Sequence, residues 1–129
     1  MADLKQILAV SSSGMEAQSG RLRNISQNIA NADTPGYRRK TAAFEAEMRG
    51  AEARQVHLSR TRLDRSELQR IHDPAHPMAD ASGYYDGSNV DLMVEIADAR
   101  EAQRSYEANL RMFDQARQMT SAALDLLRR

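Results

Sequence analysis

The sequence predicts a mainly α-helical chain in which long N- and C-terminal helices pack as a coiled-coil-like pair. A small, irregular middle segment that contains some β-structure joins them. Near both ends, apolar residues recur at alternating spacings of three and four, which is typical of a helical seam. Pro, Gly and Asp gather instead in the middle. The expected divisions are a helix with its turn at 1–36, the middle segment at 37–87 and a second helix at 88–129.

The N-terminal helix is predicted over residues 4–32. Polar residues at Ser11 and Gln18 interrupt its seam, and Pro35 ends it because a residue before proline is pushed out of the helical region. Gly36 then allows a tight turn with positive φ. The large apolar seam residues are Leu4, Leu8, Met15, Leu22, Ile25 and Ile29.

This first helix contains poor helix formers. Gly14 and Gly20 each cost about 1 kcal/mol relative to Ala, and several Ser and Asn residues add to that cost. The periodicity therefore favours a helix while the intrinsic propensities oppose one. We expect packing against partners to supply the difference.

The C-terminal helix is stronger, because neither Gly nor Pro occurs after Gly87. The stretch from Ser88 to Asp91 has the spacing of a capping box. Ion pairs are expected between Glu107 and Arg111 and between Asp114 and Arg117. The large seam residues of this helix are Leu92, Ile96, Tyr106, Leu110, Phe113, Leu124 and Leu127.

Two such helices do not obviously complete a core by themselves. Burying a Leu, Ile or Met contributes about 1.5–3 kcal/mol, whereas ordering the backbone of one residue costs about 1–2 kcal/mol. Each seam has only a few large apolar residues, so we expect other copies or other proteins to supply further helices. The alternative, that the two helices simply pack on each other within one domain, stays open.

The middle segment gives weaker signals. Residues 41–54 are rich in Ala and Glu and predict a short helix interrupted at Gly50. Residues 55–63 and 68–72 are candidate strands, with a possible hairpin turn at 64–67 between them. The Pro-, Gly- and Asp-rich stretch that follows predicts a surface loop.

The composition argues against several classes of function. Lys and Arg number 18, as do Asp and Glu, so the chain lacks the basic excess expected for binding nucleic acid. There is no Cys, and His72, Asp73 and His76 lie among prolines without a further ligand, so no metal site or other cofactor is expected. No oriented nucleophile and base form a recognisable motif. We therefore expect neither an enzyme nor a small-molecule substrate.

The beginning of the sequence does not resemble a cleaved secretory signal, because its apolar run is too short. The chain is therefore expected to stay in the cytoplasm or to leave by a route that needs no such signal.

Two sets of residues resemble a known family. Residues 13–18 and 28–39 resemble the N-terminal signature of bacterial flagellar rod and hook proteins, and residues 84–91 and 101–110 resemble their C-terminal signature. Residues 72–84 are similar to those of the proximal rod members. The signature positions singled out here are Asn28, Asn31, Thr34, Pro35, Gly36, Tyr37 and Arg38.

The resemblance implies a structural subunit whose terminal helices pack into the tube of the proximal rod, in the periplasm. It implies contacts with copies of the chain, other rod proteins, the membrane-ring protein and a small rod adaptor subunit. Export would use the flagellar type III apparatus without a cleaved signal. Arg38 and Arg39 are expected to pair with acidic residues of a neighbour. A cytoplasmic coiled-coil adaptor or export chaperone is the alternative.

Overall fold

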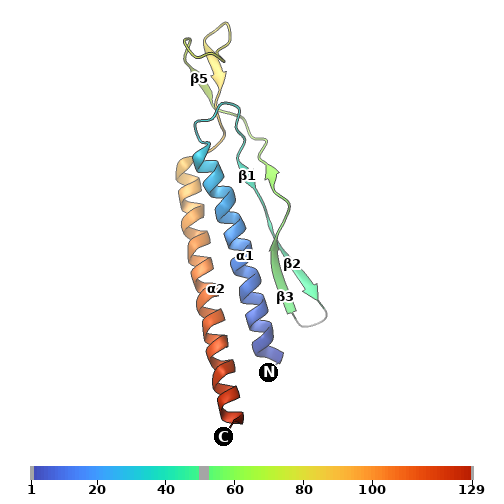
Figure 1. Ribbon diagram of the computed structural model, residues 1–129. Coiled ribbons are helices and arrows are strands. Elements are labelled where there is room, and N and C mark those ends of the chain that lie inside the picture. Colours follow the sequence, from blue (N-terminus) through green and yellow to red (C-terminus); the bar gives the residue numbers. More distant parts are fainter. Residues whose placement is uncertain (1, 50–52, 129) are drawn as a thin grey trace.

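The chain is described by a computed structural model that covers residues 2–49 and 53–128. Two antiparallel helices lie side by side, α1 (Ala2–Ala30) and α2 (Leu92–Leu127), and α2 continues past the beginning of α1 (Figure 1). The predicted class, a terminal helix pair with a small strand-containing middle, is confirmed. In the part of the chain that the structure covers, neither helix is long and apolar enough to cross a bilayer.

The middle segment forms three antiparallel two-stranded sheets, which pair β1 with β4, β2 with β3, and β5 with β6. The first two sheets follow each other along one ribbon beside α1, and the β5–β6 hairpin projects beyond the helix pair (Figure 1). The strands are β1 (Lys40–Thr41), β2 (Phe44–Arg49), β3 (Ala53–Leu58), β4 (Arg62–Leu63), β5 (Arg70–His72) and β6 (Tyr84–Asp86).

The expected helix at 41–54 is wrong for the residues that the structure describes, because β2 and β3 form a hairpin there; Gly50 itself lies outside the described residues. Contact with α1 explains the difference. The backbone N–H of Val56 donates to Ser13 Oγ at 3.1 Å, so β3 is held against the helix. Such packing outweighs the helical preference of the Ala and Glu residues in this stretch.

The hairpin expected around residues 64–67 is also wrong, because β3 pairs with β2, and β5 pairs with β6. The capping box expected from Ser88 is wrong as well. Asp91 is the N-cap of α2, and its side chain accepts from Met93 N at 3.0 Å. Ser88 Oγ instead donates to the carbonyl of Ala32, so it joins the two helix ends.

The turn after α1 forms as predicted. Gly36 has φ 73°, and the N–H of Tyr37 donates to the carbonyl of Thr34 at 3.2 Å. Pro35 in the second position and a positive-φ glycine in the third are typical of a type II turn. The Gly36 N–H also reaches the carbonyls of Asp86 and Gly87, which fixes the turn against the end of β6.

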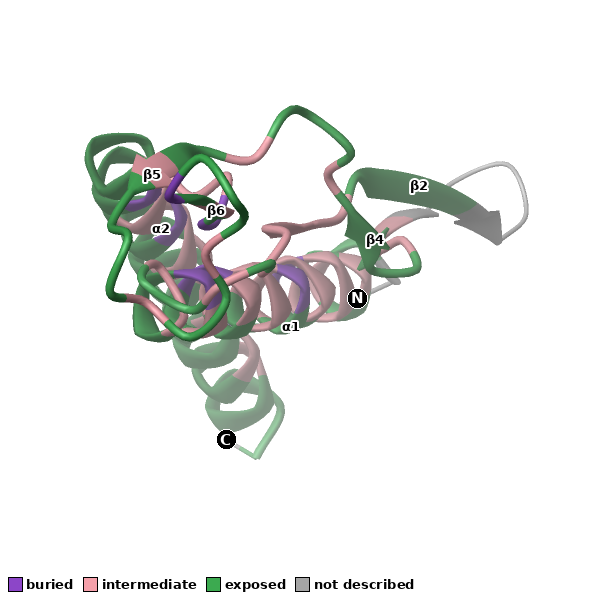
Figure 2. Cartoon of the chain, turned by 90° about the horizontal axis from the view of Figure 1, so that it is seen from above, coloured by how far each residue is buried: buried purple, intermediate pink, exposed green. Residues whose placement is uncertain are grey.

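The core is small and half polar. Buried apolar residues are few, and buried polar residues accompany them, mostly at the helix contact (Figure 2). On α2, the buried positions Glu95, Ala102 and Ala116 repeat at multiples of seven. Asn109 continues this line and lies so close to Gly14 that a Cβ there would approach its side chain to 2.8 Å. On the α2 side, small and polar side chains, and not leucines, therefore lie along the line of contact between the helices.

A candidate assembly site

The structure places the predicted seam of α1 inward. Ile25 is buried, and Ile29, at the end of the helix, is 39% exposed. The remaining large seam residues are half-buried: Leu4, Leu8, Met15 and Leu22. This helix contacts both α2 and β3, so two elements of the same chain cover it.

The predicted seam of α2 has a different environment. Tyr106 and Phe113 are half-buried, but the other large members are exposed by 40% to 77%. These exposed members are Leu92, Ile96, Leu110, Leu124 and Leu127. They lie beside the line of contact with α1, so this helix has a large apolar surface that its own chain leaves uncovered.

The ion pairs expected along α2 do not form. Among the described residues, no ion pair or hydrogen bond joins Glu107 to Arg111 or Asp114 to Arg117. These exposed charges are therefore available to a partner.

A polar network, here called the hub, joins the two helices where α1 ends and α2 begins. Asn28 is 1% exposed and uses all its hydrogen-bonding groups. Its Oδ1 accepts from Tyr37 Oη at 2.9 Å and from Lys40 N at 2.7 Å. Its Nδ2 donates to the carbonyl of Lys40 at 3.0 Å and to Glu95 Oε2 at 3.3 Å.

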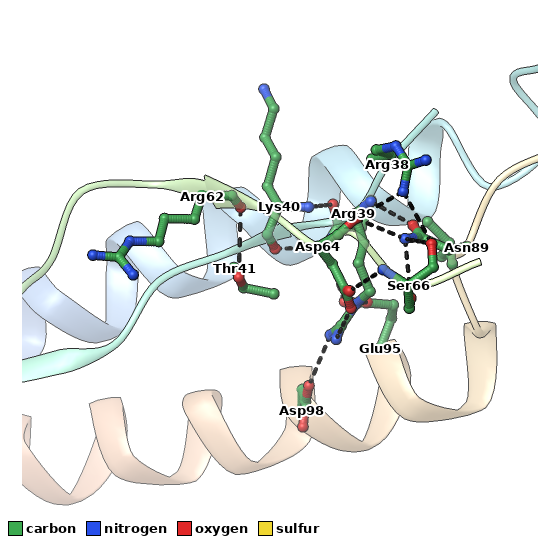
Figure 3. A network of polar contacts seen from close by, with 12 residues as sticks. Arg38, Arg39, Lys40, Thr41, Arg62, Asp64, Ser66, Asn89, Glu95 and Asp98 are labelled. Atoms are coloured by element: carbon green, nitrogen blue, oxygen red, sulfur yellow. Dashed lines mark hydrogen bonds and ion pairs between the residues drawn. The ribbon is translucent and has the colours of Figure 1, made fainter. Parts of the chain in front are cut away.

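Glu95 is fully buried, and Arg39 compensates its charge. Arg39 Nε donates to Glu95 Oε1 at 2.8 Å, and the same guanidinium lies 3.6 Å from Asp64 and 3.7 Å from Asp98 (Figure 3). A buried carboxylate is tolerated when it is paired and hydrogen-bonded in this way. Arg39 thus has ion-pair partners within its own chain, while its pairing with a neighbouring subunit stays a prediction.

Asn89 ties the segment before α2 to the rest of the hub. Its Oδ1 accepts from Arg39 N at 2.7 Å, and its Nδ2 donates to the carbonyl of Asp64 at 2.9 Å. Arg38 donates to the carbonyl of Ser66 at 3.0 Å, so its guanidinium also binds its own chain. The hub thus joins four stretches of sequence (Figure 3).

The hub shifts the pKa of several groups. Burial raises the pKa of Tyr37, and the charge of Glu95 adds to that effect. Burial alone would lower the pKa of Arg39, but the hydrogen bond to Glu95 and the surrounding carboxylates raise it. Hydrogen bonds from Ser66, with help from Arg39, lower the pKa of Asp64. Arg39 and Asp64 are thus held in their charged forms and Tyr37 in its neutral form.

The other signature residues shape the chain reversal. Asn31 Nδ2 donates to the carbonyl of Gln27 at 2.8 Å, and Asn31 Oδ1 accepts from Thr34 Oγ1 at 3.1 Å. Sequence reasoning missed Glu95 as a member of the network. Its heptad spacing from Ala102 and Ala116 was the available signal, because that line identifies the buried side of α2.

The projecting β5–β6 hairpin is held by its own polar contacts. Asp80 Oδ1 accepts from the N–H groups of Ser82 and Tyr84, and Arg70 pairs with its other oxygen at 3.0 Å. These hydrogen bonds lower the pKa of Asp80 to about 2. The ring of His76 stacks on that of Tyr85 at 3.9 Å. The predicted surface loop is thus a compact tip.

The geometry defines a class of protein: a helix pair locked at one end by a buried polar network, in which α2 leaves most of its larger apolar side chains exposed. Residues 8–38 match the family described as "Flagella basal body rod protein", and residues 81–126 match "Flagellar basal body rod FlgEFG protein C-terminal".

Individual relatives cover nearly the whole chain. The flagellar basal-body rod protein FlgC of Agrobacterium fabrum is 41% identical, over 99% of this chain and 98% of its own length. The proteins of the same name from Salmonella typhimurium and Bacillus subtilis are 30% and 31% identical, over 95% and 92% of this chain and 97% and 95% of their own lengths. The chain belongs to the flagellar basal-body rod protein family.

Proposed function

We propose that the chain is a structural subunit of the proximal rod of the flagellar basal body, and that it polymerises through its terminal helices. The exposed apolar surface of α2 carries this proposal. Leu110 and Leu124 are 40% and 46% exposed, although they lie on a well-formed helix that packs against α1. Large exposed apolar surface of this kind is typical of a protein–protein contact.

The proposed assembly interface consists of the seam residues of both helices. Those on α2 supply exposed surface, and those on α1 position that surface through the intramolecular contact. Each large side chain that becomes buried on assembly would contribute about 1.5–3 kcal/mol. No catalytic, metal-binding or cofactor role is part of the proposal.

The proposed partners are other copies, other rod proteins, the membrane-ring protein, a small rod adaptor and the flagellar export apparatus. The proposed location is the periplasmic part of the basal body, reached without a cleaved signal peptide. Family membership supports the basal-body location and the association with other rod components, because the curated relatives carry the name of a basal-body rod protein.

Replacing Leu110 with Glu tests the interface. Leu110 touches no part of the hub, so the Leu110→Glu chain should fold normally, be absent from purified basal bodies and fail to restore swimming to a strain that lacks the native protein. Gln118→Glu changes another exposed position of α2 and is the matched control, which should swim. Normal swimming and normal incorporation of Leu110→Glu would refute the proposal. Ile25 is a poorer target, because it is buried within its own chain.

The adaptor or chaperone alternative makes a different prediction. Such a protein should be a stable helical dimer when purified alone. A rod subunit should be monomeric when dilute and gain helix as it assembles. Circular dichroism and sedimentation over a range of concentrations separate the two.

A further inference from the structure

The exposed apolar residues of α2 fall into two separate strips, named here flank one and flank two. Flank one consists of Leu92, Ile96, Leu110 and Leu124, and flank two consists of Val94, Met112, Met119 and Leu126. All eight side chains are between 40% and 71% exposed. Residues two positions apart on an α-helix differ by about 200° in direction and about 3 Å in height. The two flanks therefore face opposite ways, and the line that contacts α1 lies between them.

Residues of the two flanks occur in pairs that lie at nearly the same position along the axis of α2. Leu92 and Val94 form one such pair, two residues apart, and so do Leu110 with Met112 and Leu124 with Leu126. If two copies lie side by side with parallel α2 helices, flank one of the first meets flank two of the second at these three levels of the helix. A shift of about 3 Å aligns the pairs.

Flank two also contains a groove that can receive a side chain. The groove measures about 220 Å³ and lies between Ile7 of α1 and Met112, Ala116 and Met119 of α2. A cavity of about 150 Å³ already accommodates benzene. Methionine side chains adapt their shape to an incoming apolar group. A leucine from flank one therefore fits this groove in both size and polarity.

The charges beside the two flanks are complementary. Arg104 and Arg111 border flank two, and Glu107 and Asp114 border flank one. Both pairs are spaced by seven residues, and within the described chain none of the four takes part in an ion pair or hydrogen bond. Parallel helices with heptad-spaced opposite charges beside an apolar seam select each other as partners.

We infer that flank one of one copy packs against flank two of the next copy, with the two α2 helices parallel. The contact joins two different surfaces, so it is heterologous, and each copy can hold one neighbour on each side. This inference rests on the proposed function and names the partner and the two surfaces of the same interface.

The chain has no cysteine, which makes disulfide trapping a clean test. Leu110→Cys and Met112→Cys are combined in one chain, where they point away from each other and cannot form an internal bridge. Oxidation of purified basal bodies should give a ladder of covalently linked subunits. Leu110→Cys combined with Gln118→Cys is the matched control and should give no ladder.

Single variants decide between the possible geometries. Dimers from Leu110→Cys alone or from Met112→Cys alone would show like flanks meeting, and would overturn the inference, as would the absence of a ladder from the double variant in basal bodies that contain the chain. Basal bodies that lack the chain altogether would instead contradict the proposed function.

A charge exchange tests the parallel pairing independently. Reversing Glu107 and Asp114 to Arg should abolish the ladder. Reversing Arg104 and Arg111 to Glu in the same chain should restore it, because the complementary signs return. Failure of that rescue, in a variant whose circular dichroism is native, would contradict the pairing.

Discussion

Asn28 is the residue on which the hub depends most. A single amide satisfies both backbone groups of Lys40, accepts from Tyr37 and donates to the buried carboxylate of Glu95. Its own exposure is 1%, so water cannot replace these contacts without local opening. The amide therefore couples the end of α1 to the return strand and to α2.

Replacing Asn28 with Ala should lower the free energy of unfolding by about 2–3 kcal/mol, because each buried polar group left without a partner costs about 1–3 kcal/mol. Asn24 is a half-buried amide of the same helix, so Asn24→Ala is the matched control and should lower the free energy of unfolding much less. Urea unfolding followed by circular dichroism measures both. Equal effects of the two variants would show that the hub is not a special source of stability.

Removing the carboxylate of Glu95 should lower the stability of the fold more than removing that of Glu101. Glu95 is fully buried against Arg39, whereas the side chain of Glu101 is 69% exposed and 3.6 Å from Arg21. Breaking a buried ion pair from one side costs about 3 kcal/mol or more, and an exposed pair contributes about 0–1 kcal/mol. Thermal unfolding of Glu95→Ala and Glu101→Ala measures the difference. A Glu95→Ala chain as stable as the Glu101→Ala chain would contradict this account.

The hub also shows where sequence reasoning stops. The turn at Pro35 and Gly36 depends on local backbone preferences, so it could be predicted from these two residues alone. The pairing of Arg39 with Glu95 joins positions 56 residues apart, and only the fold brings them together. An arginine after a turn suggests a partner, but the sequence does not say whether that partner lies in the same molecule.

At the scale of elements, the two helices were predictable because periodicity extends over many turns. The strands were not, because their stability depends on docking against α1 more than on their own composition. The spacing of the large apolar seam residues of α2 could also be predicted from the sequence. The side of the helix that faces α1 could not, because Glu95, Ala102 and Ala116 lie there in place of the leucines.

The β5–β6 hairpin should respond to acid through Asp80. In the folded chain the pKa of Asp80 is lowered from 3.8 to about 2. The contribution of its carboxylate to the stability of the hairpin is therefore fully present above pH 3.8 and disappears as the pH falls through about 2. The protection of the Tyr84 amide, whose N–H donates to Asp80, should therefore fall below pH 3.8, when its exchange rate is compared with that of an unstructured chain at the same pH. Asp80→Asn should remove this part of the pH dependence. An unchanged exchange profile in that variant would show that another group controls the hairpin.

The whole molecule is asymmetric in its internal support. α1 is covered from two directions, while α2 contacts α1 along one narrow line of small and polar side chains and continues beyond it (Figure 1). Few apolar side chains are buried, so the pair has little reserve of hydrophobic stabilisation. Neighbouring copies would supply what the chain lacks.

The amides of α2 beyond the hub should therefore exchange quickly in the dilute chain and slowly in the assembly, since local opening is easiest where few apolar contacts are buried. Residues of the hub should be protected in both states. Hydrogen exchange with mass spectrometry, on the purified chain and on isolated basal bodies, compares the two. Strong protection throughout α2 in the dilute chain would mean that the helix needs no neighbour.

Both chain ends lie at the same pole of the helix pair, far from the β5–β6 hairpin (Figure 1). A fluorescent protein or affinity tag fused to either end would therefore obstruct the end of α2, where Leu124, Leu126 and Leu127 are exposed. A short epitope inserted between Met78 and Asp80, at the opposite pole, would leave that region clear. Tracking this subunit in living cells thus calls for a label inside the chain instead of at its ends.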